Sequence, residues 1–477
     1  MFDALFTTTT EYKKLSHALS GKGACALFGL PASGRAQVYA ALCRQLDKPL
    51  CIVTPGEAEA TRFAADLNTL GIPAAVFPAR DYVLRPIEGT AREYEYRRLA
   101  VLGELVGGRL RAVAVPAEAL TQFTTPKEDF CANTRTLHAG DTLLRDDLLA
   151  ALFGAGYTRR AQVDGPGQFS VRGDIVDIFA PDQKMPVRME FWGDEIDTLH
   201  TFDLTTQRRE DAIDKFYLSP AREVLFGKPA DAAEQLRAFL AKQRGKKKTA
   251  MADCMAADLD LLDGGAVPVN MDKYLAVRYP HPATVLDYFD DPILVAEEPA
   301  SIREADRATA YRRGEELKSL ILDGVLCAGL DNLYADPSYL WSKTGHYRTI
   351  CAENFARSMP DQPLKDIINA PAHTLPAWNG EVAGLLEDLK PLCDAGHTVT
   401  LLAGTDRAAA GLARDLRDKG ILVTTDAAAA PAAGLVQVLA GHLSAGCEFP
   451  FAKYALLTGR AFGETSSQKK KRKKAKD

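Results

Sequence analysis

Two glycines near the N-terminus have the spacing of a phosphate-binding loop, or P-loop. In FGLPASGRAQVYAAL, residues 28–42, Gly29 and Gly34 lie between an apolar run and a helical pattern. A P-loop cradles phosphates with backbone N–H groups, reaches them with a lysine, and holds Mg²⁺ through a serine or threonine hydroxyl. Those two positions are Arg35 and Ala36 here. The magnesium ligand is therefore missing, and a guanidinium does not reproduce the geometry of an ammonium group.

The acidic motif that accompanies such a loop is also incomplete. A helicase-type ATPase needs an aspartate and a glutamate at the end of a later apolar strand, to hold Mg²⁺ and orient water. The best candidate, PILVAEEPAS at residues 292–301, has Glu297 and Glu298, and Ala296 stands where the aspartate is needed. We interpret the loop as a strand-to-helix turn that only maintains the fold. Nucleotide binding without hydrolysis is the alternative.

A second notable region, residues 165–209, alternates apolar and polar residues with a period of two, which predicts antiparallel strands. One hydrophobic core can draw on Val171, Ile175, Ile178, Val187, Met189 and Phe191. Arg172, Arg188 and Trp192 are harder to bury. On the outer face of the sheet, an exposed tryptophan between arginines would resemble a protein-binding hot spot. Alternatively, Trp192 belongs to the core and both arginines pair with Asp174, Glu190 or Asp194; the residues alone favour neither arrangement.

The surrounding elements predict a multidomain α/β protein. Strands and helices alternate in a first domain, which indicates a parallel sheet with crossover helices. An α+β domain with an antiparallel sheet interrupts it, and a small α/β domain without a recognisable motif follows. Thr405 is a predicted helix N-cap in that last domain. The predicted boundaries are 1–122 and 218–345 for the two parts of the first domain, 123–217 for the inserted domain, 346–463 for the small domain, and 464–477 for a solvated basic linker.

Composition narrows the function classes. The 477 residues contain no apolar stretch long enough for a membrane span and no export signal, so we expect a cytoplasmic protein. The net charge is −5, but without the lysine-rich last thirteen residues 51 basic residues stand against 62 acidic ones. We therefore expect weak DNA binding or none, with a salt-dependent contact by Lys469–Lys474 as the alternative. The nine scattered cysteines have no metal-ligand spacing, so we expect reduced thiols and no metal.

The pattern FSVRGDIVDIF…PVRMEFWGDEID…TFD…TQR resembles a signature shared by UvrB, the helicase subunit of nucleotide excision repair, and the transcription-repair coupling factors (the Mfd family). Residues 77–120 are similar to the coupling factors, because they lack the long tyrosine-rich insertion with which UvrB clamps damaged DNA. The resemblance covers residues 1–460 and is weak over 346–463. It implies a degenerate helicase-like fold and the N-terminal part of a longer chain.

In that family, the N-terminal region imitates UvrB and recruits UvrA to RNA polymerase stalled at DNA damage. Matched to the motif, the UvrA-contacting positions are Arg172, Arg188 and Trp192, with Glu190 beside them; relatives often have phenylalanine at the position of Trp192. The resemblance implies no catalytic residue and no cofactor in this chain. ATP, Mg²⁺ and the contact with RNA polymerase would belong to downstream domains. The competing hypothesis is an ATP-dependent, UvrB-like DNA helicase or damage-loading subunit.

Overall fold

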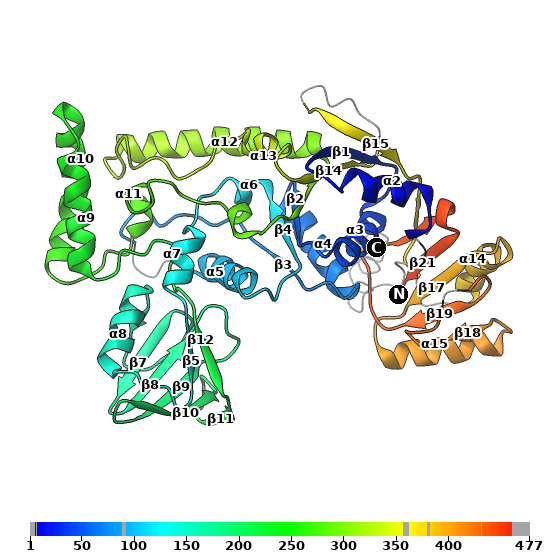
Figure 1. Ribbon diagram of the computed structural model, residues 1–477, viewed down its shortest axis with the longest axis horizontal. Helices are drawn as coiled ribbons and strands as arrows, with labels where there is room; N and C mark the ends of the chain where they lie inside the picture. The colour runs from blue at the N-terminus through cyan, green and yellow to red at the C-terminus, as the bar shows by residue number, and fades with distance from the viewer. Residues whose placement is uncertain are drawn as a thin grey trace, which may run out of the picture.

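The computed structural model describes residues 5, 7–87, 92–355, 362–378, 382–430 and 432–459. The predicted basic linker, including Lys469–Lys474, lies outside them. The molecule is elongated (Figure 1): two α/β units lie at one end, a pair of helices lies at the other, and a β-rich domain projects from one side. Within the described ranges, no helix has the length and apolar character needed to cross a membrane.

A seven-stranded sheet forms the frame of the first unit. Its order is β15-β1-β14-β13-β2-β4-β3, and every neighbouring pair is parallel. Its strands are β1 (Gly23–Phe28), β2 (Leu50–Thr54), β3 (Ala74–Val76), β4 (Ala112–Pro116), β13 (Ile293–Glu297), β14 (Arg348–Glu353) and β15 (Leu364–Asn369). The main helices that accompany the strands are α2 (Thr10–Ala18), α3 (Ala32–Leu46), α4 (Glu57–Thr69), α5 (Glu93–Val106) and α12 (Pro299–Leu322).

The parallel sheet agrees with the predicted fold class, but it extends beyond the predicted first domain. Strands β14 and β15 come from residues that the sequence pattern assigned to the last small domain. They pair on either side of β1, with Cys25 opposite Ile350 and Ala26 opposite Ile367. A boundary at residue 345 would therefore cut through this sheet. Sequence periodicity identifies a strand but not its neighbours, which is why the division was misplaced.

A second, six-stranded sheet forms the projecting domain, in the order β11-β10-β9-β8-β7-β6. All its pairs are antiparallel except β6–β7. Helix α8 (Arg145–Gly154) and the two-stranded ribbon β5–β12 contribute to the same core. The strands are β5 (Arg135–His138), β6 (Thr158–Arg159), β7 (Gln168–Arg172), β8 (Ile175–Phe179), β9 (Val187–Trp192), β10 (Glu195–Phe202), β11 (Arg209–Ala212) and β12 (Lys215–Leu218).

A buried ion network joins this domain to the frame where the chain returns from it. Glu223, fully buried, accepts from Arg98 Nε at 2.6 Å and lies 3.3 Å from Arg80 Nε. Arg80 also pairs with Asp272 at 2.7 Å. Burial opposes the charge of Glu95, but Arg80, Arg222 and Arg92 outweigh it and lower the pKa of Glu95 to about 2. Charges from three distant segments thus neutralise one another at the base of the inserted domain.

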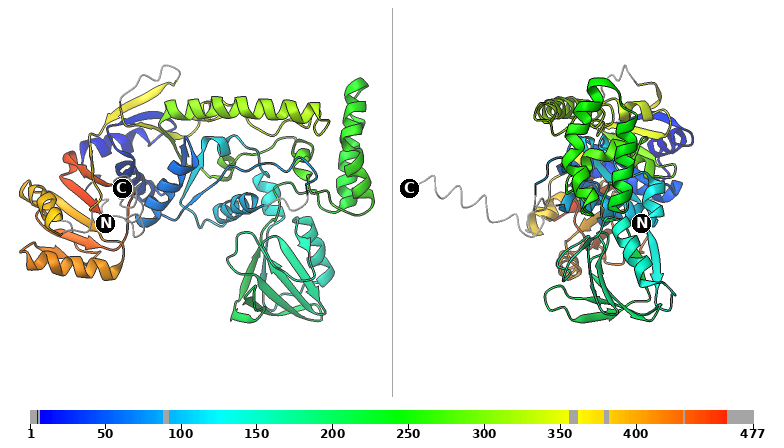
Figure 2. Two further views of the ribbon diagram at one scale, coloured as in Figure 1. Left: turned by 180° about the vertical axis from the view of Figure 1, so that it is seen from behind. Right: turned by 90° about the vertical axis from the view of Figure 1, so that its left-hand side faces the viewer.

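The remaining elements form the helical end and the C-terminal unit. Helices α9 (Pro229–Ala241) and α10 (Gly245–Asp263) stand side by side at the far end of the molecule (Figures 1 and 2). Gly245 has φ +58°, so the chain turns there and separates them. Short helical segments are α6 (Ala117–Leu120), α7 (Lys127–Ala132), η1 (Met271–Tyr274), α11 (Leu275–Arg278), η2 (Val285–Tyr288) and α13 (Tyr339–Lys343).

The C-terminal sheet has the order β16-β20-β21-β17-β19-β18, parallel except at β16–β20 and β20–β21. The predicted N-cap is confirmed: Thr405 Oγ1 accepts from Ala408 N at 3.2 Å. The elements are β16 (His373–Leu375), α14 (Val382–Asp394), β17 (Thr398–Leu402), α15 (Asp406–Asp418), β18 (Val423–Thr424), β19 (Val436–Leu439), β20 (Gly446–Phe449), η3 (Pro450–Ala452) and β21 (Tyr454–Thr458).

Candidate protein-binding surface and a closed phosphate loop

The P-loop-like segment connects β1 to α3 by a tight turn. Gly29 has φ +88°, and a Cβ there would lie 3.0 Å from Asn369 Oδ1 and 3.1 Å from Pro371 Cα. Only glycine fits this conformation without strain. Helix α3 begins at Ala32, so Gly34, Arg35 and Ala36 belong to the helix, whereas the sequence pattern placed Gly34 before it.

Arg35 turns inward onto the acidic pair that follows β13. Its Nη2 lies 2.8 Å from Glu297 Oε2 and 3.0 Å from Glu298 Oε1. Its Nη1 donates to Leu30 O at 3.0 Å and to Asn354 Oδ1 at 3.2 Å. Burial opposes the charge of Arg35, but the neighbouring anions outweigh it and raise its pKa. The cation and the acids at the nucleotide-contacting positions therefore neutralise each other.

Glu297 is enclosed as completely as its partner. Its exposed fraction is 1%, and Tyr39 donates its hydroxyl hydrogen to Oε1 at 2.6 Å. Burial raises the pKa of Glu297, although Arg35 acts in the opposite direction. The partners of the Glu297 carboxylate are thus the buried guanidinium of Arg35 and the phenol of Tyr39. The arrangement is that of a structural ion pair.

The C-terminal unit covers the first turn of α3. A Cβ on Gly34 would lie 2.9 Å from Cys447 Sγ and 3.4 Å from the ring of Phe449, both in β20. On the neighbouring helix α4, Asp66 accepts from the backbone N and the Oγ of Ser444 at 2.8 and 2.6 Å. Side chains of the last sheet thus pack against the helix that a P-loop would present to phosphate.

The second region, residues 165–209, forms β7 to β10, and alternation along β9 separates two faces. Val187, Met189 and Phe191 are buried in the domain core, so Arg188, Glu190 and Trp192 lie on the opposite, outer face. Ile175 was predicted in the core and is not: it lies opposite Glu190 on the outer face. Val176 occupies the core instead. The error arose because residues 175 and 178 cannot share one face of a strand with a period of two.

Asp177 holds both arginines on this outer face. It is 1% exposed; Arg188 Nε donates to Oδ1 at 2.7 Å, and Arg172 Nη2 lies 2.5 Å from Oδ2. The hydrogen bond that Arg188 donates to Asp177 raises the pKa of Arg188 and outweighs the opposing effect of burial. Arg188 also stacks on the ring of Phe202, 4.8 Å from its centroid, and its side chain is 11% exposed. Arg172 and Arg188 therefore both pair with Asp177. The sequence analysis had considered Asp174, Glu190 and Asp194 as their partners, and not Asp177.

Trp192 is not in the core. It is 81% exposed and ends β9, next to the two-residue turn Gly193–Asp194. Arg172 ends β7 beside the matching turn Gly173–Asp174, with its side chain 48% exposed. The register places both hairpin tips at the same end of the sheet. Trp192 and Arg172 are therefore the accessible members of the predicted set.

Glu190 is a less accessible member. It forms an ion pair with Arg209 of β11 and accepts from Thr198 Oγ1 at 3.3 Å, and its side chain is 20% exposed. Sequence reasoning did not single out Asp177 or Arg209. A signal for Asp177 was present, since an acid between Val176 and Ile178 must face outward on a period-two strand. No such signal marks Arg209.

The residues that build this surface have a known counterpart. Residues 136–224 match a family model. That model is the UvrB interaction domain. The match starts within β5 and includes the whole six-stranded sheet, with Asp177, Arg172 and Trp192. The surface with the exposed tryptophan therefore lies on the part of the chain that matches the UvrB interaction domain.

Similarity to complete proteins extends over most of the chain. The transcription-repair-coupling factor of Bacillus subtilis (strain 168) is 26% identical over 459 residues, which are 94% of this chain and 39% of the relative. The transcription-repair-coupling factors of Staphylococcus haemolyticus (strain JCSC1435) and Staphylococcus aureus (strain MRSA252) are 25% and 23% identical, with the same shares of both chains. This chain spans 39% of the length of these relatives and corresponds to their N-terminal part. The predicted resemblance is thus confirmed.

Proposed function

We propose that this chain is a non-catalytic, UvrB-imitating module of transcription-coupled nucleotide excision repair, which recruits UvrA to RNA polymerase stalled at DNA damage. The observation that carries the proposal is an exposed Trp192 on the outer face of a UvrB interaction domain. The similarity to transcription-repair-coupling factors supports the repair context. Contact with RNA polymerase would fall to a part of the relatives beyond the similar region.

The surface suits a transient protein complex. Trp192 supplies a rigid aromatic anchor, and Arg172 supplies a half-exposed cation whose orientation is fixed by Asp177. Arg188 would act on the partner indirectly, because its fork is occupied by Asp177 and its stem by Phe202. We expect Trp192 to contribute most of the affinity and Arg172 to contribute orientation and association rate.

Titration of the purified chain with UvrA tests the proposal. Trp192→Ala should weaken binding by about 30-fold, the effect of losing a hot spot worth about 2 kcal/mol. Arg172→Ala should weaken UvrA binding less than Trp192→Ala does. The effect of Arg172→Ala should be larger at low salt than at high salt. Tyr311→Ala is the matched control, because Tyr311 is an aromatic residue 75% exposed on α12, outside the domain. Unchanged affinity for both Trp192→Ala and Arg172→Ala would rule out this surface.

An ATPase assay on the same preparation separates this proposal from a UvrB-like helicase. The ion pairs of Arg35 with Glu297 and Glu298 support the absence of hydrolysis. We therefore expect no DNA-stimulated ATP hydrolysis, and the downstream translocase would be the only user of ATP and Mg²⁺. Hydrolysis that disappears in an Arg35→Ala variant would establish the helicase alternative.

A further inference from the structure

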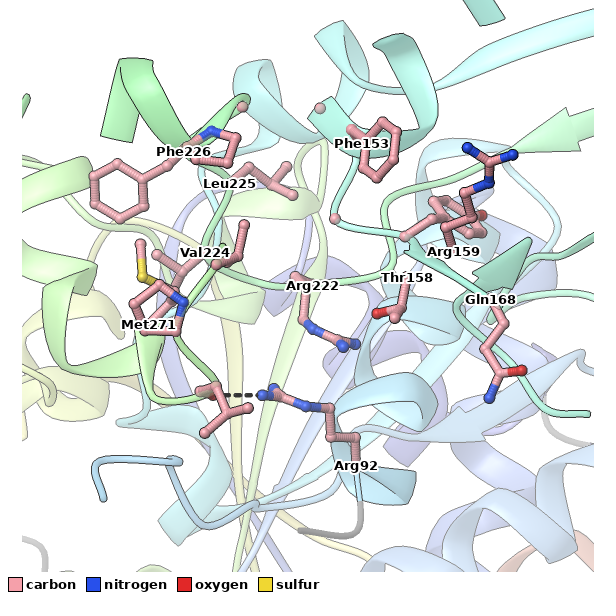
Figure 3. Close-up of a pocket in the computed structure, with 18 of the residues that line it drawn as sticks. Arg92, Phe153, Thr158, Arg159, Gln168, Arg222, Val224, Leu225, Phe226 and Met271 are labelled. Atoms are coloured by element: carbon pink, nitrogen blue, oxygen red, sulfur yellow. Dashed lines mark hydrogen bonds between the residues drawn. The ribbon is translucent and has the colours of Figure 1, made fainter. Parts of the chain in front are cut away.

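A large cavity lies where the projecting domain meets the helical end of the molecule. Its volume is about 1030 Å³, at the upper end of the range for ligand pockets. It is lined by the end of α8, by β6 and the start of β7, by residues 222–229, and by the segment that follows α10. In Figure 3, Val224, Leu225, Phe226 and Met271 gather on one side, Thr158, Arg159 and Gln168 on the other, and Arg92 and Arg222 lie between them. The cavity thus has an apolar wall and a polar wall.

The polar wall has an excess of positive charge. Arg92 pairs with Glu95 at 2.8 Å and Arg222 is hydrogen-bonded to Tyr96, so both are held in place. Arg159 and Arg160 are exposed and form no ion pair with any residue the structure describes. Two acids of the described part of the chain line the cavity. Asp272 is already paired with Arg80, so Asp164 is the acid that remains to balance the arginines. On a body with net negative charge, such a local excess favours an anionic ligand.

Apolar side chains offer surface to the same ligand from both sides of the cavity. Phe153 is 44% exposed and lies on the side of Thr158 and Arg159 (Figure 3), and Val267 at the cavity is 59% exposed. Val224 and Leu225, both buried, belong to the apolar wall on the other side. Exposed apolar residues that gather in a concave site indicate a ligand-binding site, whereas singly scattered ones do not. A fully hydrophilic anion, such as inorganic phosphate, would leave this wall unused.

The edge of the six-stranded sheet adds backbone groups. Strand β6 is the last strand of the sheet, and the backbone N–H groups of Thr158 and Arg160 both donate towards β7, to Gly167 O and Phe169 O. The peptide groups of Arg159, between them, therefore face away from the sheet. An open edge of this kind accepts an added extended strand.

We propose that this cavity binds an extended acidic segment of a partner protein, with a large apolar side chain of that segment against Phe153 and Val267. The backbone of the segment would pair with the free edge of β6. Its carboxylates would contact the side chains of Arg159 and Arg160, which form no ion pair with the residues that the structure describes. This site is separate from the Trp192 surface and does not depend on the UvrA assignment.

Fluorescence anisotropy with a defined probe tests the proposal. The probe is a short fluorescein-labelled peptide of alternating glutamate and leucine, titrated with the whole chain at low salt. Arg159→Glu combined with Arg160→Glu should weaken binding at least about tenfold, and Val267→Asp should weaken it similarly. Arg414→Glu, the reversal of an exposed cation on α15, is the matched control and should change the affinity less than twofold. Trp192→Ala should leave this affinity unchanged.

Three further probes discriminate between ligand classes. A peptide with serine in place of leucine should bind at least about fivefold more weakly, and a lysine–leucine peptide should not bind. A fluorescein-labelled oligothymidylate should bind more weakly than the acidic peptide. Equal loss of oligothymidylate and peptide binding in the arginine variants would identify a nucleic-acid site and overturn the proposal. Absence of peptide binding, or binding that is indifferent to Arg159→Glu, Arg160→Glu and Val267→Asp, would also overturn it.

Discussion

Replacing Arg35 by methionine should destabilise the first unit without affecting any enzymatic activity. The substitution removes both ion pairs of Arg35. Among the described residues it leaves Glu297, 1% exposed, with the hydroxyl of Tyr39 as its one hydrogen-bond donor, 2.6 Å away. Breaking a buried ion pair by removing one partner costs about 3–5 kcal/mol, because the remaining charge is uncompensated. We expect the variant to lose about that much free energy of unfolding at neutral pH. In a working P-loop, loss of the lysine would primarily abolish hydrolysis.

A double-mutant cycle shows whether the cost comes from the orphaned acid. Glu297→Gln in the Arg35→Met background removes the buried charge, so the double variant should recover at least about 2 kcal/mol. Loss of Arg35 removes an interaction that lowers the pKa of Glu297, so that pKa should rise further above its already raised value. Protonated Glu297 costs less to bury, and the deficit of Arg35→Met should shrink as the pH falls.

Urea unfolding followed by circular dichroism measures these effects, using the transition of the unit that contains α3. Arg44→Met is the control on the same helix: Arg44 is exposed and donates to Leu70 O at 3.0 Å, so we expect a loss of about 1 kcal/mol or less. The reasoning is refuted if Arg35→Met unfolds at the same urea concentration as the parent chain. It is also refuted if the loss of unfolding free energy in the double variant equals the sum of the losses in Arg35→Met and Glu297→Gln.

Three other predictions follow from burial. Glu223→Gln should lower the free energy of unfolding by about 3–5 kcal/mol, because Arg98 loses its buried carboxylate partner; equal urea midpoints would contradict this. Burial raises the pKa of Asp306 to about 6, so the folded protein should lose stability as the pH rises from about 4 to about 6. Asp306→Asn should therefore stabilise by about 1–3 kcal/mol at pH 7 and have no effect below about pH 4, as thermal unfolding at both pH values would show. Gly34→Ala should destabilise by about 1–3 kcal/mol through contact with Cys447, and an added Cys447→Ala should relieve part of that cost in urea melts.

Local patterns predicted the fold class and the strand-to-helix turn at the P-loop-like segment, because both depend on short-range periodicity and residue type. The period-two strands and the Thr405 cap were identifiable for the same reason. The place of β14 and β15 was not predictable, because strand neighbours far apart in sequence are chosen by packing. The actual partner of Arg35 was also hidden: Glu297 was identified as an incomplete catalytic acid, and only the fold shows the two side chains 2.8 Å apart.

The site was predicted in part. The set Arg172, Arg188, Trp192 and Glu190 came from a family resemblance, and the residues alone could not decide whether Trp192 was buried. The structure places Trp192 outside, at 81% exposure, and turns Arg188 towards Asp177. Which of these residues touch UvrA stays a prediction. The cavity beside β6 had no sequence signal, because its walls come from four separate segments.

The position of β1 within its sheet has a consequence for the order of events during protein synthesis. Cys25 of β1 donates to Thr349 O of β14, 324 residues later in the chain. At about 5–20 residues per second, a ribosome needs roughly 16–65 s to synthesise that interval. Residues 136–224 emerge in the meantime with a complete core of their own. The domain that carries Trp192 can therefore fold first, while the N-terminal strand remains without its neighbours and exposed to chaperones until the second half of the chain arrives.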